Sequence, residues 1–137
     1  MLDKTDLAIL ELLKANCKVH LRDIGEEVHL TGQAVANRVS RMESLGVIKG
    51  YTVLLDEELL GKTITAYVTI FMKTTNHVAF HVFLKDNESV VEASRISGEG
   101  CYMLKIQVNS QLDLNHFLDS VLQYGNYRIN ISIGKIK

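Results

Sequence analysis

Residues 21–45 constrain the fold more than any other segment of the chain. The segment reads LRDIGEEVHLTGQAVANRVSRMESL, and apolar side chains recur at helical spacing on both sides of a break at residues 29–32. Each half is therefore expected to form a short helix with one apolar stripe, and the two stripes can bury each other. This pattern predicts a helix-turn-helix, whose stripes are Leu21, Ile24 and Val28 in the first helix and Val35, Val39, Met42 and Leu45 in the second.

The residues around the break support this prediction. Gly25 lies where the two helices would cross, and the absence of a side chain lets the backbones approach closely, while Leu30 can fill the turn. Thr31 is a good N-cap for the second helix and Gly46 is a good stop. A plain helical hairpin with a solvated outer face is the alternative interpretation.

The second helix is expected to expose a polar and partly cationic face, made of Gln33, Ala34, Asn37, Arg38, Ser40, Arg41 and Ser44. Such side chains can hydrogen-bond to base edges and pair with phosphates. We therefore expect double-stranded DNA as the main partner, contacted by Thr31, Gln33, Ala34, Asn37, Arg38, Ser40, Arg41 and Lys49.

The charge balance argues against indiscriminate binding to DNA. The chain has 15 Lys and Arg residues against 16 Asp and Glu residues, so any affinity for DNA must come from where the charges lie. Acidic residues crowd the first motif helix, and Arg38 and Arg41 dominate the second. A near-neutral monomer is expected to assemble in order to collect enough phosphate contacts for tight binding.

Composition and the N-terminal sequence indicate where in the cell the protein is expected to reside. With 47% hydrophobic residues the chain can bury a core, and no apolar run is long enough to span a bilayer. The N-terminus has the acidic amphipathic character of a helix, in place of the pattern of a signal peptide. We expect a cytosolic protein that associates with the nucleoid and not with a membrane, with Cys17 and Cys101 as reduced thiols.

The motif is flanked by two further elements. Asp3 can cap a helix that runs to about Ala15 and covers the helical pair with Leu7, Ile9, Leu10, Leu12 and Leu13. After Gly46, the β-branched run VIKGYTVLL predicts a strand that leaves the helical unit, as in a winged or strand-tailed helix-turn-helix. We expect a DNA-binding domain over residues 1–50 with its motif at 21–40, a strand linker over 51–62 and a second domain over 63–137.

In the second domain, the spacing of apolar residues alternates between that of strands and that of helices. Strands are expected over residues 63–73, 89–97 and 101–108, helices over 77–85 and from Ser110 to about Tyr124, and a last strand through Ile129, Ile131 and Ile133. Ser110 and Asp113 resemble a capping box, and the buried face of that helix is expected to be Leu114, Phe117, Leu118, Val121 and Leu122. The order predicts a ferredoxin-like βαββαβ sandwich, so the fold class is α+β.

Both helices of such a sandwich cover the same face of the sheet. The first strand is apolar on both sides, with Tyr67 and Phe71 on one and Ala66, Val68 and Ile70 on the other. The face without helices therefore keeps apolar character, which is typical of burial against another subunit. We expect a homodimer.

The whole chain resembles the Lrp/AsnC (feast/famine) family of bacterial and archaeal transcription regulators. The specific segments are LDKTDLAILELL, RVSRMESLGVIKGY and VVEASRISGEGCYMLKIQV. The resemblance implies that residues 31–34 begin the recognition helix and that Arg38 and Arg41 are its recurrent basic residues. It also implies dimers joined through the C-terminal sheets, assembly into tetramers or octamers that bend DNA, and amino-acid effectors bound between dimers.

Three residues depart from the family pattern. His29 replaces the glycine usual at the turn, where a positive φ is needed. Ser40 stands where many members carry a basic residue, which removes a possible phosphate contact. Cys101 occupies the place of the carboxylate that pairs with the ammonium of the effector, and a thiol cannot form that bond. The candidate effector turn is Gly98, Glu99, Gly100 and Cys101, with Glu99 as the alternative carboxylate.

Other chemistries have weaker signals. His77 and His81 are spaced to share a helix face and could hold a metal, but no third ligand lies at a convincing offset, so we expect surface or interface histidines. Cys101 has no identifiable base, and the glycine turn is too short to hold a phosphate. An enzyme or ligand sensor on this scaffold is the alternative function, because some tetrapyrrole decarboxylases are similar to Lrp/AsnC proteins. We expect no cofactor.

Overall fold

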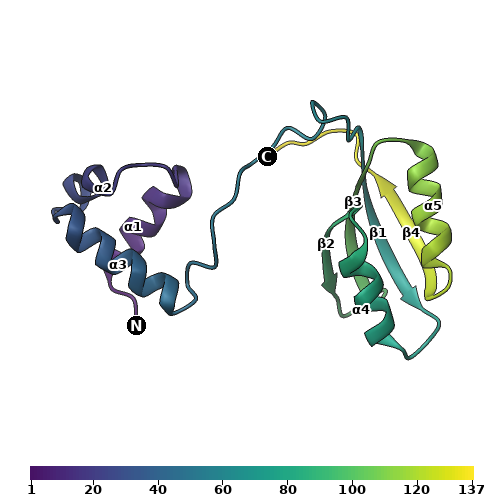
Figure 1. Cartoon of the computed structure of the whole chain (residues 1–137). Helices are drawn as coiled ribbons and strands as arrows, with labels where there is room; N and C mark the ends of the chain where they lie inside the picture. The colour runs from purple at the N-terminus through teal and green to yellow at the C-terminus, as the bar shows by residue number, and fades with distance from the viewer. The chain divides into compact units, whose positions relative to one another are not determined.

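The computed structural model describes all 137 residues of the chain. The chain divides into two compact units, Met1–Leu54 and Leu55–Lys137, of which the first is helical and the second mixes strands and helices (Figure 1). None of the helices combines the length and the apolar character needed to cross a bilayer.

The first unit contains three helices, α1 (Lys4–Ala15), α2 (Leu21–Val28) and α3 (Gly32–Ser44). Asp3 caps α1 as expected, because its side chain accepts a hydrogen bond from the backbone N–H of Asp6. All three helices contribute to one small core, made of Ile9, Leu13, Ile24, Val35, Val39 and Met42. This confirms the predicted three-helix unit.

The turn between α2 and α3 is held by close backbone contact. His29 adopts the left-handed conformation with φ 57°, and the N–H of Leu30 donates to the carbonyl of Gly25 over 2.8 Å. A Cβ atom on Gly25 would lie 2.4 Å from the carbonyl oxygen of Leu30. Gly25 is therefore needed for the approach of the turn to α2, as predicted, and His29 takes the positive φ at the position usual for glycine.

Two predicted apolar contacts of this unit are wrong. Leu7 is 53% exposed and Leu45 is 62% exposed. The buried stripe of α1 is Asp6, Ile9 and Leu13, and Leu7 lies off that stripe because one helix face cannot hold all five leucine and isoleucine positions. Leu45 is the C-cap of α3 and already lies beyond the packed turns.

The predicted strand over VIKGYTVLL does not form, and no wing is present. The structure has no strand between Ser44 and Ile64, and Val53 and Leu54 are 72% and 98% exposed. A strand needs a neighbour to accept and donate its backbone hydrogen bonds, and the single chain offers none to this segment. The N–H groups of Val47 and Ile48 donate to the carbonyl of Met42 at the end of α3, and the hydroxyl of Tyr51 donates to Glu43 over 2.8 Å.

The second unit has the predicted order of strands and helices. Its elements are β1 (Ile64–Met72), α4 (His77–Asp86), β2 (Val90–Arg95), β3 (Tyr102–Val108), α5 (Gln111–Val121) and β4 (Gly125–Ile131). The sheet order is β2-β3-β1-β4 with every neighbouring pair antiparallel, which confirms the ferredoxin-like fold and the α+β class. Helix α5 and strand β4 end earlier than expected, so Leu122 is 45% exposed and Ile133 lies outside the sheet.

The two helices cover one face of the sheet (Figure 1). The core between them contains Ala66, Val68, Ile70, Leu104 and Ile106 from the strands and Phe80, Leu84, Leu114, Phe117, Leu118 and Val121 from the helices. The register places Tyr67, Phe71 and Met103 on the opposite face. Tyr67 and Met103 are 43% and 41% exposed, so this face keeps the apolar side chains that the alternation predicts.

Candidate nucleic-acid interface

Helix α3 presents a row of polar side chains to solvent. Thr31 accepts a hydrogen bond from the N–H of Ala34 over 3.1 Å and so caps the helix as predicted. One turn along, the amide of Gln33 donates to that of Asn37 over 3.1 Å. Gln33, Asn37, Ser40 and Arg41 are exposed, and Lys49 follows the helix as an exposed cation without an ion pair. These side chains can reach a ligand without rearrangement of the helix.

Arg38 and Ala34 are half-buried, contrary to the expectation that both face solvent. The Nη1 atom of Arg38 donates to Asp3 over 2.7 Å and to Asp6 over 2.8 Å. These contacts place the guanidinium against the start of α1, where it holds two helices together. Arg38 is therefore a structural residue in this unit, and its charge is already matched within the chain.

Asp6 is the centre of this arrangement. It is fully buried and is the one buried charged residue of the chain. Its carboxylate accepts hydrogen bonds from Arg38, from Arg41 and from the backbone N–H of Asp3. A buried carboxylate needs such partners, because removing it from water is costly unless charge and hydrogen bonds are supplied.

The network changes the acidity of its members. The pKa of Asp6 is lowered, first by the N–H of Asp3 and then by Arg38, and the pKa of Asp3 is lowered chiefly by its hydrogen bond from Arg38. The pKa of Arg38 is raised by the same two carboxylates. The network is therefore fully charged near neutral pH.

Sequence reasoning missed this role of Asp6, although a signal was present. Asp6 precedes Ile9 by three positions and Leu13 by seven, which is the spacing of the buried stripe of α1. An acidic residue at a core position needs a cationic partner, and the arginines of α3 are the nearest cations within the same small unit.

The candidate effector turn closes between β2 and β3. The N–H of Ile96 donates to the carbonyl of Cys101 over 3.0 Å, and Gly98 and Gly100 have φ values of 112° and 89°. A Cβ atom on Gly100 would lie 2.6 Å from the methyl of Thr69, so this glycine is required by both conformation and space.

The two side chains expected to bind an effector are already engaged. Cys101 is half-buried and packs against the core of the second unit. The carboxylate of Glu99 pairs with Arg128 over 3.2 Å, and the Arg128 guanidinium lies 5.3 Å from the centre of the Phe71 ring. Glu99 and Arg128 are both largely exposed, so their pair is weak and a ligand could displace it.

His77 and His81 are half-buried and lie against Tyr102. The Tyr102 hydroxyl lies 2.6 Å from Nδ1 of His77 and 2.8 Å from Nε2 of His81. The sequence predicted that the two rings share a helix face, but it did not identify Tyr102, which comes from β3. No three His, Cys, Asp or Glu side chains gather as a metal site would require.

A helix-turn-helix with an exposed polar second helix, followed by a ferredoxin-like unit, defines a two-domain DNA-binding regulator. Residues 2–43 match the AsnC-type helix-turn-helix domain, and residues 65–137 match the Lrp/AsnC ligand binding domain. The chain belongs to the Lrp/AsnC family of transcriptional regulators.

Known relatives and structures agree with this assignment. The chain is 43% identical over 136 residues to the HTH-type transcriptional regulator LrpB of Bacillus subtilis (strain 168), covering 99% of this chain and 91% of LrpB. It is 33% identical over 136 residues to LrpA of the same organism, covering 98% of this chain and 100% of LrpA.

Among solved structures, Bacillus subtilis LrpC has a TM-score of 0.94 at 29% identity, covering 100% of this chain and 98% of LrpC. A transcriptional regulator from Neisseria meningitidis, crystallised in complex with L-Met, has a TM-score of 0.92 at 23% identity, covering 100% of this chain and 93% of that one. The second likeness shows the shared fold.

The Asp6 network predicts a specific acid sensitivity of the first unit. The folded-state pKa values of Asp3 and Asp6 lie below the ordinary value of 3.8, so their stabilisation is complete above about pH 3.8 and is lost as the pH falls further. We expect Asp6→Asn to lower the melting temperature of the helical unit by about 10 °C or more, and to flatten its dependence on acid pH. Circular dichroism melts over a pH series measure both effects.

Glu11→Gln is the matched control, because Glu11 pairs with Lys14 on the exposed side of the same helix. This change should move the melting temperature by no more than about 2 °C. An acid transition identical in wild type and in Asp6→Asn would show that the network does not carry the pH dependence.

Proposed function

We propose that this regulator reads double-stranded DNA with the exposed face of α3, as a homo-oligomer. The observation that carries the proposal is the exposed pair of Gln33 and Asn37, which lies in the first two turns of the helix beside Arg41. Side-chain amides can make two hydrogen bonds to adenine, and the first turns of a recognition helix are the part that meets base edges.

The expected contact set changes in one respect. Thr31, Gln33, Asn37, Ser40, Arg41 and Lys49 remain as candidates, and the half-buried methyl of Ala34 can still meet a thymine methyl. Arg38 is assigned to the α1–α3 junction, because both of its acceptors lie within the chain. Arg41 keeps a 49% exposed side chain while it pairs with Asp6, so it can reach a phosphate from a fixed position.

Assembly of several copies would supply the phosphate contacts that a single, nearly neutral chain lacks. The chain carries a net charge of −1, and both arginines of α3 already face carboxylates. A dimer would offer two copies of α3 to successive major grooves, and further assembly to a tetramer or octamer would multiply phosphate contacts and bend the DNA. A protein bound to DNA in this way would be associated with the nucleoid.

We place the dimer interface on the face of the sheet without helices. Tyr67, Phe71 and Met103 lie on this face next to Thr69 and Lys105, so apolar and polar side chains alternate as they do in many subunit interfaces. A second copy would bury these apolar side chains, which solvent now reaches.

The side chains of α3 favour a regulatory role over an enzymatic one. An enzyme acting on a tetrapyrrole acid needs cations to hold several carboxylates, and the two arginines of α3 are not free for that task because they are paired with Asp3 and Asp6. Exposed amides on α3 have an evident use in reading base edges and none in such a reaction.

We also propose that the glycine turn does not sense free amino acids in the manner of the family. Cys101 packs into the core and cannot pair with an ammonium group, and the nearest carboxylate, Glu99, pairs with Arg128. A bound amino acid would have to displace the Glu99–Arg128 pair, and its ammonium group would find no buried carboxylate to pair with.

The DNA proposal predicts that Gln33→Ala combined with Asn37→Ala weakens binding to a selected operator at least about tenfold, since each amide pair supplies roughly one bidentate base contact. Gel shifts and fluorescence anisotropy across a salt series measure the effect. The salt slope should stay unchanged for this variant and should fall by about one for Lys49→Gln, which removes a phosphate contact.

A matched control exists on α5, where Gln111 donates to Asn115 over 3.0 Å in the same spacing. Gln111→Ala combined with Asn115→Ala should leave DNA binding unchanged. Equal losses of affinity in both double variants, or none in either, would rule out reading of DNA by α3.

The dimer proposal predicts that Tyr67→Asp or Met103→Asp raises the dimer dissociation constant at least about a hundredfold, because each places a charge in an apolar interface. Sedimentation equilibrium measures this constant. Val78→Asp is the control, since Val78 is 75% exposed on α4 away from the open face. Dimers of unchanged strength in both open-face variants would place the interface elsewhere.

The effector proposal predicts that the twenty free amino acids raise the melting temperature of the protein by no more than about 1 °C each at millimolar concentration. Differential scanning fluorimetry on the full chain measures this. A rise of several degrees that disappears in Glu99→Gln would show that Glu99 has taken the place of the missing carboxylate.

A further inference from the structure

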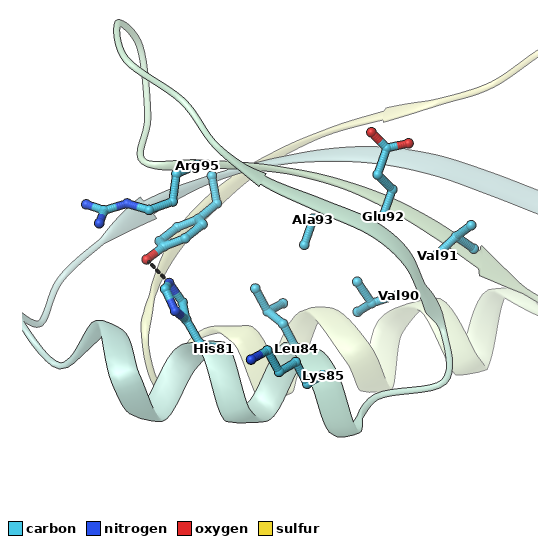
Figure 2. Close-up of a pocket in the computed structure, with 9 residues that line it drawn as sticks. His81, Leu84, Lys85, Val90, Val91, Glu92, Ala93 and Arg95 are labelled. Atoms are coloured by element: carbon cyan, nitrogen blue, oxygen red, sulfur yellow. Dashed lines mark hydrogen bonds between the residues drawn. The ribbon is translucent and has the colours of Figure 1, made fainter. Parts of the chain in front are cut away.

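A groove between α4 and β2 is not used by the proposed DNA or dimer surfaces. It has a volume of about 350 Å³, which is within the range of sites for small molecules. Figure 2 shows the helix forming one wall and the strand the other, with Leu84 pointing up between them. The groove lies wholly within the second unit.

Three groups that can carry positive charge border this groove. His81 and Lys85 are one helical turn apart on α4, and Arg95 comes from β2. The Arg95 guanidinium lies 5.8 Å from the centre of the Tyr102 ring, and the Tyr102 hydroxyl holds Nε2 of His81 at 2.8 Å. In Figure 2 the side chain of Lys85 points back along the helix toward His81. Tyr102 therefore holds His81 by a hydrogen bond and lies beside Arg95.

Lys85 and Arg95 have no carboxylate partner within the chain. The ion pairs of the structure involve other residues, so neither Lys85 nor Arg95 is matched by a carboxylate. The one acidic residue of the groove, Glu92, pairs in register with Lys105 on the opposite side of the sheet, and its carboxylate points away from Leu84 in Figure 2. The groove therefore offers positive charge without a facing negative group.

The rest of the groove is apolar. Leu84, Val90 and Ala93 line it beyond the charged end, and Leu84 is buried while Val90 packs against the core of the unit. A ligand that fits must carry a negative head and a short apolar body. Inorganic phosphate would satisfy the cations but would leave the apolar wall uncovered.

We propose that this groove binds a small aliphatic carboxylate, with the carboxylate at Lys85, Arg95 and His81 and the chain along Leu84, Val90 and Ala93. The absence of a facing carboxylate disfavours an α-ammonium group, which would lie beside the same cations. The ligand class is therefore a simple carboxylic acid and not an amino acid. This proposal is independent of DNA binding.

Isothermal titration of the full-length protein tests the ligand class with four probes. We expect hexanoate to bind with a dissociation constant near or below ~1 mM. Hexanamide removes the charge and should bind at least about tenfold more weakly, and norleucine adds an ammonium group and should also bind at least about tenfold more weakly. Phosphate supplies charge without the chain and should bind more weakly than hexanoate. Equal affinities for hexanoate and hexanamide, or tighter binding of norleucine or phosphate, would overturn the proposal.

Substitutions and chemical shifts test the location. Lys85→Gln and Arg95→Gln should each raise the dissociation constant for hexanoate at least about tenfold, while Lys73→Gln, an exposed lysine that does not line the groove, should not change it. Amide resonances of Ala93, Arg95 and Tyr102 should shift as wild type is titrated with hexanoate. Shifts confined to residues outside the groove, or unchanged affinity in both groove variants, would show that the carboxylate binds elsewhere.

Discussion

The buried carboxylate of Asp6 is the constraint on which the helix-turn-helix depends. It lies between α1 and α3 and accepts hydrogen bonds from two arginines of α3 and from the backbone of Asp3. Such a site is stable only when all of its partners are in place, since an unmatched buried charge is far more costly than an unmatched charge at the surface. The capping box that begins α1 and the orientation of α3 are thus parts of one network.

This network also limits how the protein can use its charge. Arg38 and Arg41, the two arginines that the sequence predicts to contact DNA, have carboxylate partners, and the chain as a whole is close to neutral. In the function we propose, recognition relies on neutral hydrogen-bonding side chains for selectivity and on several copies of the chain for affinity. The second unit, with apolar side chains on the open face of its sheet, suits the role of bringing those copies together.

Local periodicity explains what could be predicted from the sequence. The stripes of α2 and α3 apart from Leu45, the cap at Thr31, the left-handed residue His29 and the βαββαβ order depend on residues close together in the chain, and the structure has them. Contacts between distant residues were not accessible: Asp6 meets Arg38 across 32 positions and Tyr102 meets His77 across 25. The strand expected after Gly46 failed for a different reason, because β-propensity alone does not supply a pairing partner.

The hydroxyl of Tyr102 lies within hydrogen-bond distance of one ring nitrogen from each of His77 and His81. A phenol has a single hydrogen, so it can donate to one ring only, and the other ring must donate its own N–H to the phenol oxygen. Because the rings present different nitrogens, Nδ1 of His77 and Nε2 of His81, the two neutral histidines carry their hydrogens on the same kind of nitrogen. Both carry it on Nε2 when Tyr102 donates to His77, and both on Nδ1 when Tyr102 donates to His81. They form a chain of hydrogen bonds with a direction, and this direction can reverse by the movement of protons alone while every heavy atom stays in place.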